Sequence, residues 1–238
     1  DPPHVAHVRL VETAKRVLAD PVTTQPPHIG VFGGGFDPPH VAHVRLVETA
    51  KRVLHLDRVI VVPTGQAGHK QPSKTPAEHR LAMACLAFAG VEGVEVDDCE
   101  IKRDGPSWMV DTLASLKDRA NGGGETTQSA ARWTLILGLD QLTRFETWVQ
   151  WQNIARACEL AVAYRPDGLG GQSIDAAAWR EKGVRVTSLP FEWQAVSSSA
   201  LRAAIAEQGC ASAHADWRAL VPPEAARYIC EHQLYATN

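Results

Sequence analysis

Short apolar runs alternate along the chain with longer segments in which apolar residues recur every three or four positions. Residues 29–32, 58–62 and 134–137 are runs of the first kind, and each has the length of a buried strand. The segment between the first two runs has one apolar face, formed by Val41, Val44, Val47, Ala50 and Leu54. This spacing predicts a helix, with Asp37 as its cap and Pro38 as its first residue. A strand, a helix and a second strand in this order form a βαβ unit, so the two strands should be parallel.

The same alternation continues to the end of the sequence. Helices are predicted over residues 76–89, 107–119, 198–207 and 222–233, and weaker strands over residues 94–96, 160–163 and 184–186. Two glycine-rich polar stretches, residues 121–131 and 165–173, are predicted to be loops. Repeated alternation of strands and helices predicts an α/β fold, a doubly wound parallel sheet in a single domain.

The first part of the sequence contains a perfect internal repeat. Residues 1–18 and residues 37–54 have the same eighteen letters, and residues 19–27 are a polar connector broken by prolines. Only the second copy follows an apolar strand and a glycine turn, which a phosphate site at a helix N-terminus needs. We therefore expect residues 28–238 to form the domain and residues 1–27 to stand apart from it. The sequence leaves open whether the first copy is natural, a recent partial duplication, or an artefact of sequence assembly.

The composition is that of an ordinary globular protein, with 45% hydrophobic and 21% charged residues. A net charge of −3 argues against binding to nucleic acid, and the chain has no apolar run long enough for a membrane span and no signal-like opening. These features lead us to expect a cytoplasmic protein without nucleic-acid or membrane partners. The cysteines are scattered without metal-like spacing, so reduced thiols are favoured over disulfides or zinc ligation; they are Cys85, Cys99, Cys158, Cys210 and Cys230.

The segment GGGFDPPHVAH, residues 33–43, carries the clearest chemical signal. Glycines after a strand let the backbone approach a ligand, and the following helix offers free N–H groups and a positive dipole end to an anion. His40 and His43 lie three residues apart, so both could donate hydrogen bonds to phosphate oxygens. The matching His4 and His7 lack the glycine turn and are interpreted as incidental surface residues.

A second candidate phosphate segment is VSSSALR, residues 196–202. Ser198 can cap a helix there, with Arg202 one turn further on. Taken alone, this segment is better explained as a well-capped helix without any ligand. Lys70 follows the second strand, at the edge of the sheet where α/β proteins bind ligands, although a lone loop lysine is usually only solvated.

Taken together, these motifs resemble those of the bacterial nicotinate-mononucleotide adenylyltransferases, within the HxGH-type nucleotidyltransferases. GGGFDPPHVAH is similar to the family's signature, and so in order are HK at 69–70, SWMVDTL at 107–113, GLDQLTRFETW at 138–148, VSSSALR and the tail at 220–235. The resemblance implies a Rossmann-like fold and transfer of the adenylyl group of ATP to nicotinate mononucleotide, a step of NAD biosynthesis. It also implies Mg²⁺, brought with ATP.

The resemblance further implies a set of site residues. The catalytic residues around the phosphates would be His40, His43, Lys70 and Arg202. ATP would be bound by Gly33, Gly34, Phe36, Gly138, Asp140, Ser197 and Ser198. The mononucleotide would be bound by Gly35, Met109, Thr112, Trp148 and Val149. In this set Trp148 would stack on the pyridine ring and the Val149 N–H would lie near its carboxylate, although Trp148 could instead be a core residue, as Trp151 is expected to be.

The chain departs from the family pattern at several positions. Gly35 stands where a threonine or serine is usual, and Ala42 replaces the glycine between the two histidines. Met109 stands where a threonine commonly helps to hold the nicotinate carboxylate, and residues 66–68 lack the usual prolines. The change at position 109 leaves open whether the acid or the amide mononucleotide is preferred.

The residues favour direct chemistry, because no serine–histidine or cysteine–histidine pair points to a covalent intermediate. The mononucleotide phosphate would attack the α-phosphorus of ATP, and the protein would position the groups and neutralise charge. No metal cage made by the protein is visible, which suits Mg²⁺ held by phosphates and water. Two rivals remain: a phosphopantetheine adenylyltransferase and a non-catalytic nucleotide-binding module. The oligomeric state, a homo-oligomer included, is left open.

Overall fold

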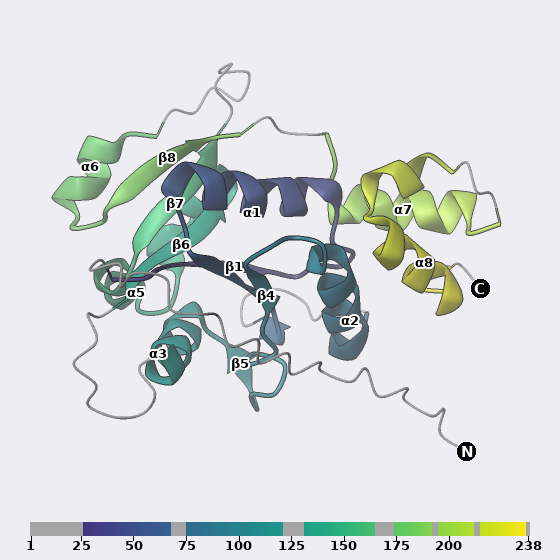
Figure 1. Ribbon diagram of the computed structural model, residues 1–238, viewed down its shortest axis with the longest axis horizontal. Coiled ribbons are helices and arrows are strands. Elements are labelled where there is room, and N and C mark those ends of the chain that lie inside the picture. The colour runs from purple at the N-terminus through teal and green to yellow at the C-terminus, as the bar shows by residue number, and fades with distance from the viewer. Residues whose placement is uncertain are drawn as a thin grey trace, which may run out of the picture.

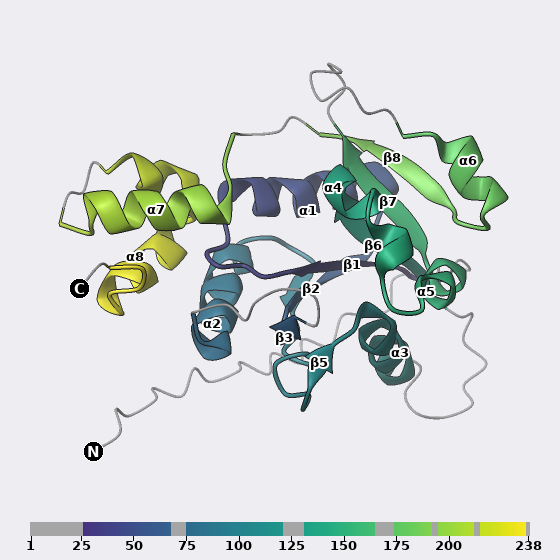
Figure 2. The ribbon, with the colours of Figure 1, turned by 180° about the vertical axis from the view of Figure 1, so that it is seen from behind.

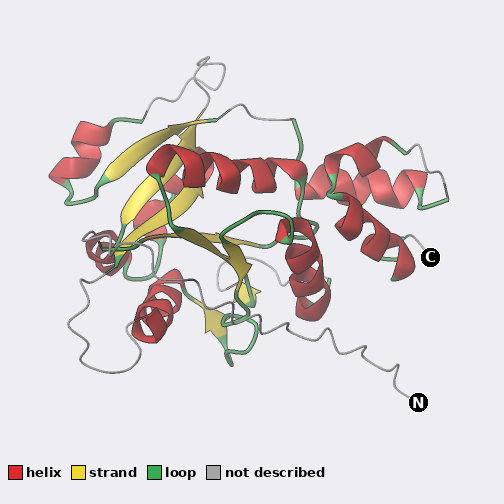
Figure 3. Ribbon diagram, in the orientation of Figure 1, coloured by secondary structure: helices red, strands yellow, loops and turns green. Residues whose placement is uncertain are grey.

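A six-stranded parallel sheet runs through the centre of the molecule (Figures 1 and 3). The computed structural model describes residues 26–67, 75–120, 131–164, 174–191, 195–211 and 215–236. In the order β4-β2-β1-β6-β7-β8, the strands are Val94–Val96, Arg58–Pro63, His28–Gly34, Arg132–Gly138, Glu159–Tyr164 and Val186–Pro190. The chain moves outward from β1 in one direction and then returns to build the other half from β6. The predicted doubly wound parallel sheet is therefore confirmed.

Helices cover both faces of this sheet (Figures 1 and 2). They are α1 (Val41–Leu54), α2 (Ala77–Phe88), α3 (Met109–Ala120), α4 (Leu139–Leu142), α5 (Trp151–Ala157), α6 (Ala176–Glu181), α7 (Ser198–Gln208) and α8 (Pro223–Glu231). Two 3₁₀ turns, η1 (Phe145–Thr147) and η2 (Asp216–Leu220), and a small pair of strands, β3 (Gln66–Ala67) and β5 (Pro106–Ser107), complete the described elements. None of the described helices is long and apolar enough to cross a membrane.

Two apolar cores lie on opposite faces of the sheet, because alternate residues of a strand point to opposite sides. In β1, Ile29 and Val31 join the core formed with α3 and α5, whereas Phe32 joins the core formed with α1, α2, α7 and α8. Burial on both faces explains why the strands appear in the sequence as unbroken apolar runs.

Several predicted boundaries were wrong. The last strand, β8, begins at Val186, and Val184 is buried before it rather than inside it. Helix α3 begins at Met109, because residues 106–107 pair with β3 instead of continuing the helix. The first copy of the repeat and the loops predicted over 121–131 and 165–173 lie outside the described residues, except for Ala131.

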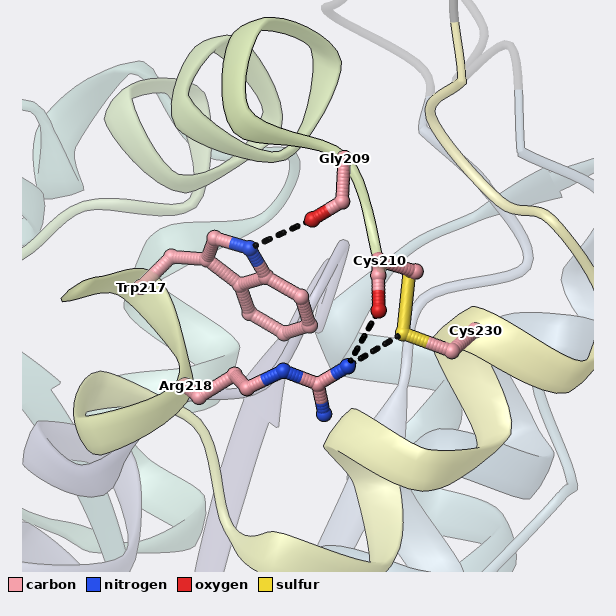
Figure 4. Close-up of a disulfide and its surroundings, with 5 residues drawn as sticks. All are labelled: Gly209, Cys210, Trp217, Arg218 and Cys230. Carbon is pink, nitrogen blue, oxygen red and sulfur yellow. Dashed lines mark hydrogen bonds between the residues drawn. A yellow bond between two sulfur atoms is a disulfide. The ribbon is translucent and has the colours of Figure 1, made fainter. Parts of the chain in front are cut away.

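The prediction that all five cysteines are reduced was also wrong. Cys210, just after α7, and Cys230, in α8, form a disulfide with a Cα–Cα distance of 5.5 Å. Arg218 lies beside it and donates hydrogen bonds to the Cys210 carbonyl oxygen (2.9 Å) and the Cys230 sulfur (3.2 Å) (Figure 4). The two cysteines are 20 residues apart and meet only because η2 and α8 fold back on α7. The free cysteines among the described residues are Cys85, Cys99 and Cys158.

Candidate active site

The candidate site lies at the carboxyl edge of the sheet, where the strand order reverses. β1 pairs with β2 on one side and with β6 on the other. The carboxyl ends of β1 and β6 are Gly34 and Gly138. Open α/β sheets bind their ligands at such a reversal, outside the carboxyl ends of the strands. The glycine turn and the residues after β6 therefore flank the expected crevice.

The turn between β1 and α1 takes a different course from the predicted one. Phe36 has a φ of 47°, and α1 begins at Val41 with His40 as its N-cap. The predicted start at Asp37 and Pro38 was wrong. Each of these residues precedes a proline, and the following ring excludes them from the helical region. The helix can therefore begin no earlier than Pro39, and it begins at Val41.

His40 and His43 form a stacked pair at the start of α1. Their ring centroids are 3.6 Å apart with an interplanar angle of 18°. The His40 backbone N–H donates to His43 Nδ1 at 3.1 Å. Because that nitrogen accepts, the proton of the neutral His43 ring is on Nε2, which is then a donor. The Nδ1 atom of His40 is buried and has no hydrogen-bond partner among the described residues.

Both histidines are held in their neutral form. Burial lowers the pKa of His40 to about 4. Burial, and then the neighbouring His40, hold the pKa of His43 well below its ordinary value. At neutral pH each ring therefore carries one N–H donor and no positive charge, and an anion bound beside the rings would raise both pKa values.

The second predicted phosphate segment lies directly against this turn. Ser198 Oγ donates to the Pro38 carbonyl oxygen at 2.9 Å, although the residues are 160 apart in the sequence. The helix cap is Ser197, whose side chain accepts from the Ala200 N–H at 3.2 Å, so the prediction of Ser198 as cap was wrong. Ser198 instead joins the start of α7 to the turn before α1.

Arg202 and Asp37 continue this junction. Arg202 Nη1 donates to the Asp37 carbonyl oxygen at 2.7 Å and lies 3.7 Å from its carboxylate. Tyr235, near the end of the chain, donates its hydroxyl hydrogen to the same carboxylate at 2.7 Å. Asp37 therefore connects Arg202 to the C-terminal segment, a link that the sequence analysis missed because the three residues meet only in the folded chain.

Met109, Trp148 and Val149 lie after β5 and β6 and are partly exposed. The Met109 Cε atom lies 2.8 Å from the position that a Cβ on Gly33 would occupy, so Met109 covers the end of β1. The Trp148 ring centroid lies 5.6 Å from that of Phe145, at a tilt of 58°. Neither the Met109 N–H nor the Val149 N–H has an acceptor among the described residues. Both backbone groups can therefore donate to a ligand.

Thr112 is placed differently from the other predicted mononucleotide contacts. Its side chain is fully buried, and its hydroxyl group donates to Glu100 at 2.8 Å. Arg103 in turn donates to the Thr112 hydroxyl oxygen at 3.2 Å. A side chain with no exposed surface does not reach a ligand. The prediction that Thr112 contacts the mononucleotide was therefore wrong, and the residue instead bonds Glu100 and Arg103.

Of the remaining predicted residues, Gly35, Gly138 and Asp140 lie at or just after the carboxyl ends of β1 and β6. Gly35 is exposed and a Cβ there would meet nothing within 4 Å, so the missing hydroxyl leaves open space. Gly138 ends β6, and Asp140 is exposed, with its carboxylate accepting from the Gln141 side chain at 2.6 Å. Lys70 lies outside the described residues.

Arg80 is a residue of this region that the sequence analysis missed. It lies on the buried face of α2 with Met83 and Ala84. An arginine on the otherwise apolar face of the predicted helix was the signal that could have found it, because buried charge needs specific partners.

Within the described ranges no group of three histidine, cysteine or acidic side chains could hold a metal ion.

Comparison with known proteins defines the class. The profile of the cytidylyltransferase-like family matches residues 31–204, so the chain belongs to that family. A relative from Albidiferax ferrireducens, named probable nicotinate-nucleotide adenylyltransferase, is 42% identical over 88% of this chain and 98% of its own. A relative of the same name from Neisseria meningitidis serogroup B is 36% identical over 87% of this chain and 98% of its own. Within the wider family, the chain belongs to the nicotinate-nucleotide adenylyltransferases.

Solved structures agree on the fold. Nicotinic acid mononucleotide adenylyltransferase of Plasmodium falciparum, complexed with NaAD, superposes with a TM-score of 0.68 at 17% identity, over 88% of this chain and 97% of that one. A putative nicotinate-nucleotide adenylyltransferase from Vibrio parahaemolyticus superposes with a TM-score of 0.58 at 16% identity, over 89% of this chain and 97% of that one. These likenesses confirm the Rossmann-like architecture.

Proposed function

We propose that this protein transfers the adenylyl group of ATP to nicotinate mononucleotide, giving deamido-NAD and pyrophosphate. The observation that carries the proposal is the junction of the two phosphate segments, where Ser198 and Arg202 bond the turn that leads to His40 and His43. This junction gathers neutral and charged donors at one edge of the sheet, which suits a chain of phosphates. The names of the relatives support the same reaction.

The proposed reaction is a single displacement at phosphorus. An oxygen of the mononucleotide 5′-phosphate attacks the α-phosphorus of ATP, a new O–P bond forms, and the bond to the bridging oxygen breaks with pyrophosphate leaving. His43 Nε2–H and the His40 ring would donate to phosphate oxygens as charge moves toward the leaving group. Arg202, which is bonded to the turn that leads to His40, would supply positive charge. Catalysis would come from position and charge, without a covalent intermediate.

In this proposal Mg²⁺ enters the site with ATP, bound to its phosphates and to water. The described residues contain no group of three ligands for a metal ion, while phosphates and water commonly provide most ligands of Mg²⁺. When bound, Mg²⁺ would neutralise part of the charge on the phosphates. Lys70 stays a predicted phosphate contact.

The proposed acceptor pocket lies between Trp148 and the start of α3. Trp148 would stack on the pyridine ring. The N–H groups of Met109 and Val149, which have no acceptor among the described residues, would meet the 3-substituent of the ring. A carboxylate accepts charge-assisted hydrogen bonds from both donors, whereas an amide offers them a single acceptor oxygen. The acid should therefore be the better substrate, by a smaller margin than a threonine at position 109 would give.

The deciding experiment compares acceptors. The purified protein is given ATP and Mg²⁺ with nicotinate mononucleotide, nicotinamide mononucleotide or phosphopantetheine, and pyrophosphate release is followed. We expect the highest kcat/KM with nicotinate mononucleotide. Faster turnover of phosphopantetheine would transfer the assignment to the rival acceptor, and binding of ATP without release for any acceptor would identify a non-catalytic module.

A further inference from the structure

Arg80 is a buried cation that the reaction described above does not use. Only 4% of the residue is exposed, and it lies on the inner face of α2. Burying an arginine is costly unless its donors are satisfied. Its partners therefore indicate what the residue does.

The guanidinium group donates four hydrogen bonds, all of them to backbone carbonyl oxygens. Nε donates to Thr75 at 3.3 Å, Nη1 to Gly35 at 3.1 Å and to Thr64 at 2.5 Å, and Nη2 to Gly65 at 3.2 Å. Gly35 directly follows β1, Thr64 and Gly65 directly follow β2, and Thr75 precedes α2. One side chain thus joins the ends of two neighbouring strands to the helix beside them.

The Gly65 end of this arrangement has no freedom to adapt. A Cβ on Gly65 would lie 2.1 Å from the Glu100 carbonyl oxygen, so the two backbones are in close contact. Glu100 is itself buried, and burial raises its pKa, an effect that the hydrogen bond from the Thr112 hydroxyl opposes. Gly65 is therefore bonded through its carbonyl oxygen to Arg80 and packed closely against the backbone of Glu100.

The Gly35 end has a direct consequence for the site. The C=O and N–H of a trans peptide point in opposite directions. Binding of the Gly35 carbonyl by Arg80 therefore turns the Phe36 N–H away from Arg80, and this N–H has no acceptor among the described residues. Removing the guanidinium would free this peptide to rotate and would leave three further carbonyls without their donor.

Among the described residues no carboxylate is hydrogen-bonded to Arg80, so the described acidic groups compensate its charge only at a distance. Burial lowers the pKa of Arg80, while Asp37, then Tyr235, Glu78 and Glu100, oppose that effect. Part of the positive charge is thus left beneath the carboxyl ends of β1 and β2, where it favours an anionic ligand.

We propose that Arg80 is a positioning residue for the mononucleotide half of the site, acting through the loops after β1 and β2. The proposal rests on the proposed function, in which Gly35, directly after β1, and Met109, which covers the end of β1, are expected mononucleotide contacts. Gly33, Gly34 and Phe36, at the end of β1 and in the loop after it, are expected ATP contacts as well. The other expected ATP contacts lie outside both loops, so ATP depends less on these loops than the mononucleotide does; they are Gly138, Asp140, Ser197 and Ser198. Arg80 therefore affects the two substrates unequally, which a residue needed only for folding would not do.

The test uses Arg80→Lys and Arg80→Met in the full chain, with Arg52→Met on the exposed end of α1 as the matched control. Arg80→Lys keeps the charge and loses the planar set of donors. We expect the KM for nicotinate mononucleotide to rise about tenfold, the loss of one or two charged hydrogen bonds, and the KM for ATP to change by less than about threefold. Arg80→Met should raise the first KM further, and the control should match wild type.

Equal changes in both KM values, or a fall in melting temperature with unchanged KM values, would overturn the proposal. If neither variant folds, the wild-type protein decides: the Arg80 Nε NMR resonance should shift on addition of nicotinate mononucleotide and not on addition of pyrophosphate, and the reverse pattern would also overturn it. Failure of the proposed function is distinguishable, because it would appear as absent turnover in wild-type protein.

Discussion

The His40→Asn substitution tests whether the stacked histidines are held neutral by the fold. Asparagine is a good N-cap residue, and His40 occupies the N-cap position of α1 with extended backbone, so the helix start should survive. The substitution removes one buried imidazole and leaves its partner in place. Its effect should therefore appear in the pH dependence of stability more than in stability at neutral pH.

The sign and size of the expected change in stability follow from the shifted pKa of His40. Its value is about 4 in the folded protein and 6.5 when unperturbed, so between these values the unfolded chain binds more protons. Stability must then fall as the pH falls through this window, by about 2 kcal/mol at about pH 5 for this group alone. Two charged imidazoles with ring centroids 3.6 Å apart would repel by about 4–5 kcal/mol at an effective permittivity of about 20. His40 and His43 therefore do not both take up a proton in the folded chain, so proton uptake by His43 does not offset the loss of stability at low pH.

The assay is urea unfolding between about pH 7 and pH 5, followed by tryptophan fluorescence. Wild type should lose about 2 kcal/mol more than His40→Asn over this range. His55→Asn is the matched control, because His55 is exposed and its left-handed backbone suits asparagine. That control should follow wild type.

If the free energy of unfolding falls by the same amount with pH in wild type and in His40→Asn, this reasoning is refuted. That result would mean that His40 titrates alike in the folded and unfolded chains, so that the two rings are not buried neutral donors. If the free energy of unfolding of His55→Asn depends on pH as weakly as that of His40→Asn, the effect comes from losing any histidine.

Three further outcomes are expected. Met109→Thr should widen the preference for the acid over the amide mononucleotide by about 1 kcal/mol in kcat/KM, one ordinary hydrogen bond; an unchanged ratio would show that position 109 does not meet the ring substituent. Tyr235→Phe should lower the free energy of unfolding by about 2 kcal/mol, because the Asp37 carboxylate loses a donor; a loss below about 0.5 kcal/mol would contradict that bond. Replacing Cys210 and Cys230 together by serine should cost about 3 kcal/mol, from the loop of about 20 residues that the disulfide closes, and dithiothreitol should then destabilise wild type but not the double variant.

The sequence predicted those parts of the fold whose signal is local and long. The apolar runs at β1, β2 and β6 and the periodic faces of α1 and α2 were correct, because burial on both faces of a parallel sheet, or on one face of a long helix, leaves a clear pattern. The short helices α4, α5 and α6 and the two-residue strands β3 and β5 were missed. Four to seven residues contain too few periods to distinguish a helix from a loop.

The candidate site was predicted less evenly. Motifs identified His40, His43 and Arg202 because the glycine turn and the serine cap stand beside them in the sequence. The bonds that join these segments were not predictable, since Asp37 meets Arg202 and Tyr235 only after the chain has folded. The start of α1 was misplaced for a local reason, the two consecutive prolines.

The repeated segment allows the most direct test of the central claim, that the phosphate site is built by the second copy. His40→Ala and His43→Ala are compared with His4→Ala and His7→Ala, the same letters in the first copy, by pyrophosphate release with ATP and nicotinate mononucleotide. The first two variants should each lose roughly a hundredfold in kcat, the scale of one lost transition-state donor, and the other two should match wild type. Equal losses in both copies, or no loss at His40 and His43, would contradict the account.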